Sequence, residues 1–319
     1  MNFKDLYLPL GLVSIIILST LIPSVGELLY NLEWYSIKIS HVLIFFIFLI
    51  SGYTLKLNDI KLNRELILVL IIGGLINLIG APIVAFIILK MDLVSSNALS
   101  LGIIAIACVP PTLVSGIVIT DIAKGDTALA IVITIFLNIA GIFILPFTFQ
   151  YFGQTDATEP ISSLKILYKL LILVIAPSII GFLIKRKLQK KAHPFLSYYQ
   201  PTAIIFIVFC TAAAGNENIK NITIAELFFL IITVLSIHLI LLLMCKFSGQ
   251  LIGLAVEKQM ALSFVCSQKT LPVSLTILIA FPKEITALAS IACLIFHLSQ
   301  IFADSFIALQ WKKHRLKKI

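Results

Sequence analysis

Long apolar stretches, each followed by a short polar link, recur along the whole chain. Ten of them approach the roughly 20 mostly apolar residues that a membrane-spanning helix needs. The links are polar or rich in turn residues, as in Asn58–Lys61 and Gly153–Asp156. The pattern predicts an all-α polytopic membrane protein in which residues 1–319 form a single integral membrane domain. The ten predicted spans are Leu6–Ile22, Ser36–Leu55, Leu66–Leu89, Ser95–Ala123, Thr127–Phe152, Leu164–Ile184, Phe195–Ala214, Ile224–Met244, Val256–Phe281 and Ile285–Leu309.

The composition excludes a water-soluble fold. Hydrophobic residues make up 60% of the 319 residues and charged residues only 12%, whereas a soluble chain carries roughly a quarter charged residues. The lipid bilayer is the solvent that tolerates this much apolar surface. The five cysteines lie in apolar stretches and form no CxxC pair. They are typical of buried small side chains, so we expect neither a disulfide framework nor a metal site there.

The positive charges predict the orientation of the chain. The net charge is +9, and its Lys and Arg residues lie in short links and at the C-terminus, a pattern typical of topology signals and not of nucleic-acid binding. Alternate links carry 17 such residues on one side and 6 on the other, with Lys269 inside a span. Because positively charged links stay in the cytoplasm, we expect both termini there, in a bacterial inner membrane. Residues 311–319 would be a basic cytoplasmic tail that meets anionic headgroups.

Two parts of the chain resemble each other. The letters CVPPTL, which begin at Cys108 in the fourth span, match CSQKTL from Cys266 in the ninth span in their Cys, Thr and Leu, at an offset of 158. Directly downstream, TALA from Thr127 matches TALA from Thr286 at an offset of 159. Chance similarity between apolar segments is the alternative, although two matches at nearly one offset, both beside prolines, favour a repeat.

Repeats of approximately 1–152 and 160–310 would each hold five spans. An odd number of spans per repeat means that the second repeat enters the membrane inverted, and inverted repeats are a signature of secondary transporters. The same register pairs further polar positions, Thr134 with Cys293 and Asn138 with His297.

Prolines interrupt the fourth and ninth spans near their centres. Pro110 and Pro111 lie in the fourth span and Pro272 in the ninth, and proline removes a backbone donor and clashes with the preceding turn. A pair of broken helices in corresponding places points to the binding site of a transporter. Simple proline kinks are the alternative. Polar residues gather around both interruptions and count against it: Thr112, Ser115, Ser267, Gln268, Lys269 and Thr270.

Lys269 is the most informative single residue. A Lys at the bilayer centre costs about 2.5–3.5 kcal/mol on insertion scales, and such residues usually face a cavity and have a function. Lys269 lies about a dozen residues from either end of its predicted span, too deep to reach the interface easily. The alternative is a structural ammonium that carbonyl groups of the broken helices satisfy, and the two interpretations are compatible.

These motifs resemble those of the bile acid:sodium symporter family, and the resemblance covers essentially the whole chain. It rests on Ala107–Pro110, Ser115 and the letters AKGDTAL from Ala123, which are similar to the family's fourth-to-fifth-span motif. The resemblance implies ten spans in two inverted five-span repeats, with discontinuous fourth and ninth helices that cross. It also implies residual sodium-site positions at Asn77, Ser115, Thr134 and Gln268.

The chain departs from the family pattern around the sodium sites. Phe264 stands where bile-acid-type members carry a glutamate, and Lys269 replaces an asparagine. Ala130 replaces a serine ligand and Gly116 an asparagine, so the chain resembles the divergent branch that includes the family's vertebrate orphan member. Because a bare cation in an apolar centre needs a nearby carboxylate, we hypothesise that the ninth-span sodium site is absent and that Lys269 takes its place. We identify no metal site with confidence, and the coupling ion, if one remains, would be sodium or a proton.

The other buried polar residues have two interpretations each. Asn138 and His297 could line a cavity beside the crossing, and Lys269 or His297 could carry a coupling proton. Alternatively, Asn138 and His297 form ordinary interhelical hydrogen bonds. His41 and His238 have no matching context, and we interpret them as packing residues.

The sequence as a whole favours a secondary carrier for a small organic, anionic solute that works by alternating access, in which one helical bundle moves against the other. The alternative is a regulatory or scaffold membrane protein that kept the fold and lost transport. An enzyme is disfavoured, because the sequence has no HExxH and no GxSxG motif. We expect no cofactor, and as partners only the solute and the lipid bilayer.

Overall fold

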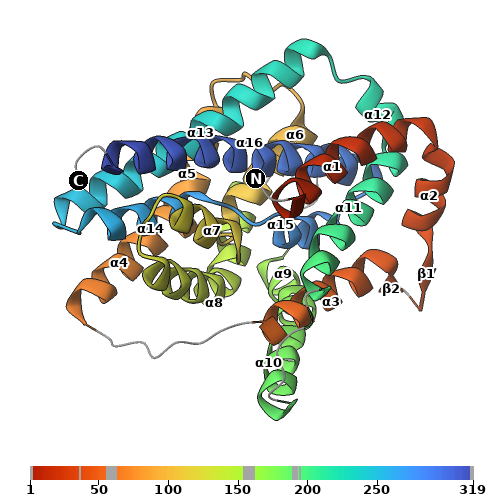
Figure 1. Ribbon diagram of the computed structural model, residues 1–319. Helices are drawn as coiled ribbons and strands as arrows, with labels where there is room; N and C mark the ends of the chain where they lie inside the picture. Colours follow the sequence, from red (N-terminus) through yellow and green to blue (C-terminus); the bar gives the residue numbers. More distant parts are fainter. Residues whose placement is uncertain are drawn as a thin grey trace. The chain divides into compact units, whose positions relative to one another are not determined.

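The structure is a computed structural model that describes residues 3–35, 37–54, 63–153, 162–188, 193 and 195–316. These residues are almost wholly helical (Figure 1). Six helical segments within them are long and apolar enough to cross a membrane, and shorter apolar helices accompany them. The prediction of an all-α membrane protein is therefore confirmed. The six segments are Arg64–Leu89, Thr127–Phe152, Ser163–Leu188, Ile224–Leu251, Val256–Leu278 and Lys283–Lys312.

The chain divides into two compact units. The first unit draws on both halves of the sequence and includes residues 275–291. Its small antiparallel hairpin pairs Glu33 with Lys38 and Trp34 with Ile37. The elements of this unit are α1 (Phe3–Leu21), α2 (Pro23–Asn31), β1 (Glu33–Trp34), β2 (Ile37–Lys38), α3 (Ile39–Thr54), α9 (Ser163–Leu170), η2 (Leu171–Ile175), α10 (Ala176–Leu188), α11 (Leu196–Ala214) and α12 (Asn216–Lys220).

Helices α3 and α10 of the first unit pack through two glycines. A Cβ atom at Gly52 would overlap the carbonyl oxygen of Ser178, and one at Gly181 would overlap the carbonyl oxygen of Leu49. Small residues let helix backbones approach closely in lipid, where van der Waals contact replaces the hydrophobic effect between helices. Each glycine therefore makes room for the backbone of the other helix.

The second unit contains the remaining helices and also draws on both halves of the sequence. Several of these helices have a side-chain N-cap, since Asn63, Ser96 and Asp126 accept hydrogen bonds from the amides of the first turns. Its elements are α4 (Arg64–Gly74), η1 (Leu75–Gly80), α5 (Ala81–Leu89), α6 (Asn97–Cys108), α7 (Ser115–Ile122), α8 (Thr127–Phe152), α13 (Ile224–Leu251), α14 (Val256–Ser267), the start of α15 (Leu271–Leu278) and α16 (Lys283–Leu316) from Ala292 onward.

The fourth and ninth predicted spans are both interrupted, and their halves match in length. Helices α6 and α14 have 12 residues each, and α7 and α15 have 8 each. The residue after each first half, Val109 or Gln268, has φ −77° and ψ 156°. The break around Pro110 and Pro111 is the longer of the two, and Pro272 lies in the first turn of α15, where proline is tolerated.

A compact apolar cluster joins helices of the second unit. It contains Ile119, Leu242, Met260 and Ala308 together with Phe264, whose side chain is fully buried. The rings of Phe264 and Trp311 lie 5.0 Å apart between centroids. Phe264 is therefore an ordinary core residue.

Several predicted features lie outside the described residues. They include most of the link that follows the second predicted span, the middle of the link between Gly153 and Ser163, and the end of the basic tail. The first part of that tail is not separate from the tenth span, because α16 continues as a helix to Leu316.

We predict that Gly52→Ala and Gly181→Ala each destabilise the protein by about 1–3 kcal/mol, the usual range for overpacking. The added methyl group has to displace backbone, which cannot rotate away. The measurement is thermal unfolding of the purified protein in detergent.

Gly74→Ala is the matched control in another helix, because its Cβ would lie 3.6 Å from Leu137 Cδ2, an ordinary contact. It should be neutral or slightly stabilising, since alanine is the better helix former. Equal melting temperatures for all three variants would contradict the proposed close packing.

Candidate functional site

The two helix breaks of the second unit meet through their backbones. The chain leaves α6 at Cys108 and re-enters helix at Ser115, and it leaves α14 at Ser267 and re-enters at Leu271. The amide of Thr270 donates a hydrogen bond to the carbonyl oxygen of Pro110 at 3.1 Å. Each break thus satisfies one backbone group that the other exposes, in a place without water to do so.

Gln268 lies at the centre of the side-chain contacts between the breaks. Its Oε1 accepts hydrogen bonds from the hydroxyls of Thr112 and Ser115, both at 2.7 Å. The same Thr112 hydroxyl oxygen accepts the amide of Gly116 at 3.2 Å. Gln268 therefore holds the beginning of α7 against the end of α14.

The other end of the Gln268 amide is bound by a carboxylate. Nε2 donates to Asp304 Oδ2 at 2.7 Å, and Asp304 Oδ1 lies 2.7 Å from Nε2 of His238. All three side chains are fully buried. Because a carboxylate only accepts hydrogen bonds, this contact also fixes which end of the Gln268 amide is oxygen.

Lys269 is fully buried, and its ammonium group is bound by carbonyl oxygens. Nζ donates to the carbonyl oxygen of Val109, in the first break, at 3.0 Å and to that of Asn77 in η1. Within the described part of the chain, Lys269 forms no ion pair with a carboxylate. The structure thus shows the contacts expected of a structural ammonium.

The sequence explains why the Asn77 carbonyl is available. Segment η1 is a π-helix, in which each carbonyl accepts from the amide five residues later, as Ile76 does from Ala81. The corresponding donor for Asn77 would be residue 82, which is Pro82 and has no N–H. The proline therefore leaves one buried acceptor that Lys269 fills.

The backbone of Lys269 is bound by Gln300 of α16. Gln300 Oε1 accepts the Lys269 amide at 2.9 Å, and Gln300 Nε2 donates to the Lys269 carbonyl at 2.7 Å. Gln300 Nε2 also lies 2.9 Å from Nδ1 of His297, which is itself 3.3 Å from the Lys269 carbonyl oxygen. The break between α14 and α15 is thus held at both backbone groups of one residue.

Two asparagine side chains donate hydrogen bonds to other backbone carbonyls near the breaks. The Asn77 side chain donates to the carbonyls of Cys266 and Gln268 at 2.8 and 3.1 Å. Asn138 donates to the carbonyls of Pro111 and Thr134 at 3.1 and 2.9 Å. These contacts match the interpretation of Asn138 as a hydrogen-bonding residue between helices.

The predicted site residues gather around the breaks, but not all of them contact one another. Of the four residual sodium-site positions, Asn77, Ser115 and Gln268 are linked, whereas the Thr134 hydroxyl donates to Ala130 within α8. Ser267 is fully buried, and its hydroxyl has no hydrogen-bond partner. No cluster of three or more His, Cys, Asp or Glu residues suited to a metal occurs among the described residues.

One of the sequence-based interpretations was wrong. His238 is not a packing residue, because it pairs with buried Asp304. Phe264 supplies no carboxylate, as the sequence indicated, but Asp304 of α16 places one beside Gln268. Asp304 and Gln300 were missed, although acidic and amide side chains inside an apolar stretch were a signal that could have identified them.

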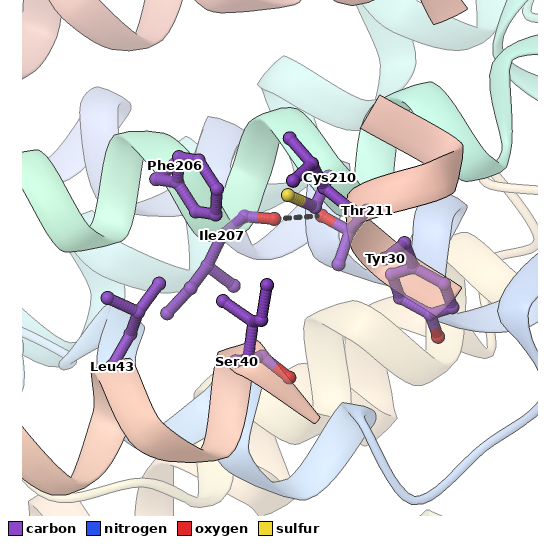
Figure 2. Close-up of a pocket in the computed structure, with 9 residues that line it drawn as sticks. Tyr30, Ser40, Leu43, Phe206, Ile207, Cys210 and Thr211 are labelled. Carbon is purple, nitrogen blue, oxygen red and sulfur yellow. Dashed lines mark hydrogen bonds between the residues drawn. The ribbon is translucent and has the colours of Figure 1, made fainter. Parts of the chain in front are cut away.

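A small pocket in the first unit does not resemble a solute site. Figure 2 shows its mostly apolar lining from α2, α3 and α11, where the Thr211 hydroxyl is engaged by the Ile207 carbonyl oxygen at 3.0 Å. Its empty volume of about 240 Å³ includes space that is open to solvent, so it encloses little room for a solute. The polar network of the second unit is the stronger candidate.

Comparison with known proteins places this network in a family context. Residues 7–313 match the SBF-like CPA transporter family. The chain is 26% identical to the probable sodium/metabolite cotransporter BASS4, chloroplastic, of Oryza sativa subsp. indica, over 96% of this chain and 75% of that protein. It is also 26% identical to the sodium/bile acid cotransporter 7-B of Xenopus laevis, over 97% of this chain and 92% of that protein, and to the sodium/bile acid cotransporter 7 of Danio rerio, over 93% and 91%.

The family match covers nearly the whole chain, from the first predicted span to the end of the tenth. It confirms the resemblance to bile acid:sodium symporters that the fourth and ninth spans indicated. The chain is therefore an integral membrane protein that functions in transport, and it is not an enzyme. The chain belongs to the SBF-like CPA transporter family.

Proposed function

We propose that this protein is a secondary active transporter that moves a small organic anion by alternating access. The observation that carries the proposal is the fully buried Lys269, held where the two helix breaks meet. Helices α7 and α15 both begin at these breaks, and helix N-termini carry partial positive charge. A buried ammonium beside two such termini favours an anion, as in other transporters with broken helices.

The fold supports this mechanism in two ways. Each half of the sequence contributes helices to both compact units, and the broken helices of the two halves agree in length and in the backbone angles where they end. Both features are what two inverted five-span repeats would produce. We therefore propose ten spans in such repeats, within one transporter domain in a bacterial inner membrane, and two units that can move as bodies.

Lys269 is proposed to occupy the electrostatic role of a sodium ion. The relatives are named as sodium cotransporters of bile acids or metabolites, but in this chain Lys269 brings a tethered cation and Phe264 occupies the family's glutamate position in the apolar core. The oxygens of Gln268, Thr112 and Ser115 are engaged with one another. We infer a carrier that does not require sodium.

A non-transporting scaffold protein is the alternative. Loss of function would relax the selection that keeps costly polar groups in an apolar centre. Gln268, Lys269 and Asp304 are all present, fully buried and hydrogen-bonded. Their retention favours transport.

We predict that both termini and the links after the second and sixth spans face the cytoplasm. Single cysteines at Lys61 and Lys190 and at the C-terminus, introduced into a variant without native cysteines, should react with a membrane-impermeant reagent only when the cytoplasmic side is open to it. Labelling of any one of them from the outside would overturn the topology.

We predict that at least one small organic anion stabilises the purified protein and is transported without sodium. A thermal-unfolding screen against acetate, pyruvate, succinate, citrate and taurocholate, with sodium or choline as the cation, identifies the anion. Its uptake into proteoliposomes should persist in choline and fall by at least about tenfold in Lys269→Ala and Lys269→Gln, because the positive charge is lost.

Lys258→Gln is the matched control, since Lys258 is a partly exposed lysine paired with Glu65 and should keep native uptake. A strict sodium requirement of the native protein, or full uptake by both Lys269 variants, contradicts the role given to Lys269. If no anion stabilises the protein and none is taken up, the result favours the scaffold alternative.

A further inference from the structure

Both ring nitrogens of His238 face hydrogen-bond acceptors. Nε2 lies 2.7 Å from Asp304 Oδ1, and Nδ1 lies 3.3 Å from the carbonyl oxygen of Ser267. The side chains of His238 and Asp304 are 0% exposed. Both side chains are shielded from bulk solvent, so the two contacts depend on the protons that the pair carries.

Both contacts are hydrogen bonds only when the pair holds two protons. A carbonyl oxygen can only accept, so the Ser267 contact needs a hydrogen on Nδ1. The contact between Nε2 and Asp304 needs a second hydrogen, whichever of the two atoms it is bound to. In that state the pair holds one proton more than a neutral imidazole beside an ionised carboxylate. His297 Nδ1 also lies 3.3 Å from a carbonyl oxygen, that of Lys269, but Gln300 Nε2 lies closer, at 2.9 Å, and can donate to it.

Loss of that proton would change a contact at the helix break. The single remaining ring hydrogen could serve Asp304 or Ser267 but not both. Ser267 is the last residue of α14, and the last carbonyls of a helix have no partner within it. The two protonation states of the pair thus differ in whether the end of α14 is bound to α13.

The same pair is two hydrogen bonds away from the start of α7. Asp304 Oδ2 accepts from Gln268 Nε2, and Gln268 Oε1 accepts from Thr112 and Ser115. A change in charge at the pair alters the strength of the Asp304–Gln268 bond and, through it, the hydroxyls beside the proposed anion site.

Asp304 of α16 is the ionisable group that contacts His238. The elements packed around α13 carry few others near their middles: α14 has Glu257 and Lys258 in its first turn and Cys266 near its end, and α13 itself has Glu226, Cys245 and Lys246 toward its ends. Segments η1 and α5 carry no ionisable side chain, and α4 carries Arg64 and Glu65 in its first turn only. Proton binding adds one positive charge to these surroundings, and that charge favours an anion nearby.

We propose that His238, paired with Asp304, is a proton-binding site and that its proton couples to solute binding in place of sodium. The coupling part rests on the proposed transport function, whereas proton binding by His238 does not. By thermodynamic linkage, a proton that favours the anion is itself bound more tightly when the anion is present.

Ring-¹⁵N NMR of the purified, histidine-labelled protein tests proton binding without any solute. Among the five histidines, the ring assigned to His238 should change from two protonated nitrogens to one as the pH is raised. That resonance should be absent in His238→Gln and shifted in Asp304→Asn, and it should remain in His297→Gln. The Asp304→Asn variant assigns the resonance if His238→Gln does not fold. A His238 ring that keeps one bare nitrogen, or that stays doubly protonated, at every pH at which the protein remains folded overturns the proposal.

Binding of the anion that the screen identifies tests the coupling separately. Its affinity should fall about tenfold or more between about pH 6 and pH 8.5 in the native protein, within the usual range of coupling. Asp304→Asn should reduce this ratio to less than about twofold, and Lys258→Gln should keep it. Equal pH ratios in the native protein and Asp304→Asn overturn the coupling. If no anion binds, the transport function fails, while the NMR result still decides whether His238 binds a proton.

Discussion

Unsatisfied backbone groups at two helix breaks are the constraint on which the rest of this site depends. In an apolar span, each carbonyl or amide without a partner costs several kcal/mol. Several polar side chains around the breaks are partners for such groups. The pairs are Thr270 N with Pro110 O, Val109 O with Lys269, Pro111 O with Asn138, Ser267 O with His238, and the peptide groups of Lys269 with Gln300.

The same constraint explains how a buried lysine is tolerated. Lys269 Nζ is bound by carbonyls that the breaks and Pro82 leave without donors, so two of its N–H groups replace missing backbone partners. Such a lysine lowers the cost of the broken helices while it brings a positive charge to their meeting point. Structural and functional roles for Lys269 are therefore not competing explanations, because a transporter site needs both a stable break and a charge.

The sequence predicts what depends on local patterns and fails where distant residues meet. Apolar stretches and prolines located the helices and the two interruptions, because length and a missing N–H act within a few residues. His238 and Asp304 are 66 positions apart, so neither residue's neighbours reveal the pair. The predicted tenth span ends at Leu309, shortly after Asp304, whereas α16 continues to Leu316 and Asp304 is fully buried. The π-helix η1 left only an ambiguous signal, a proline in an otherwise regular apolar run.

The departures from the expected sodium-site pattern concern neighbouring groups. Phe264 packs against Trp311 in the apolar core, and a carboxylate reaches Gln268 from Asp304 on a different helix. That carboxylate faces the imidazole of His238, and the carbonyls nearby bind the ammonium of Lys269. A tethered cation such as Lys269 cannot dissociate with each cycle. In the mechanism that we propose, coupling therefore comes from a proton that moves on or off these groups.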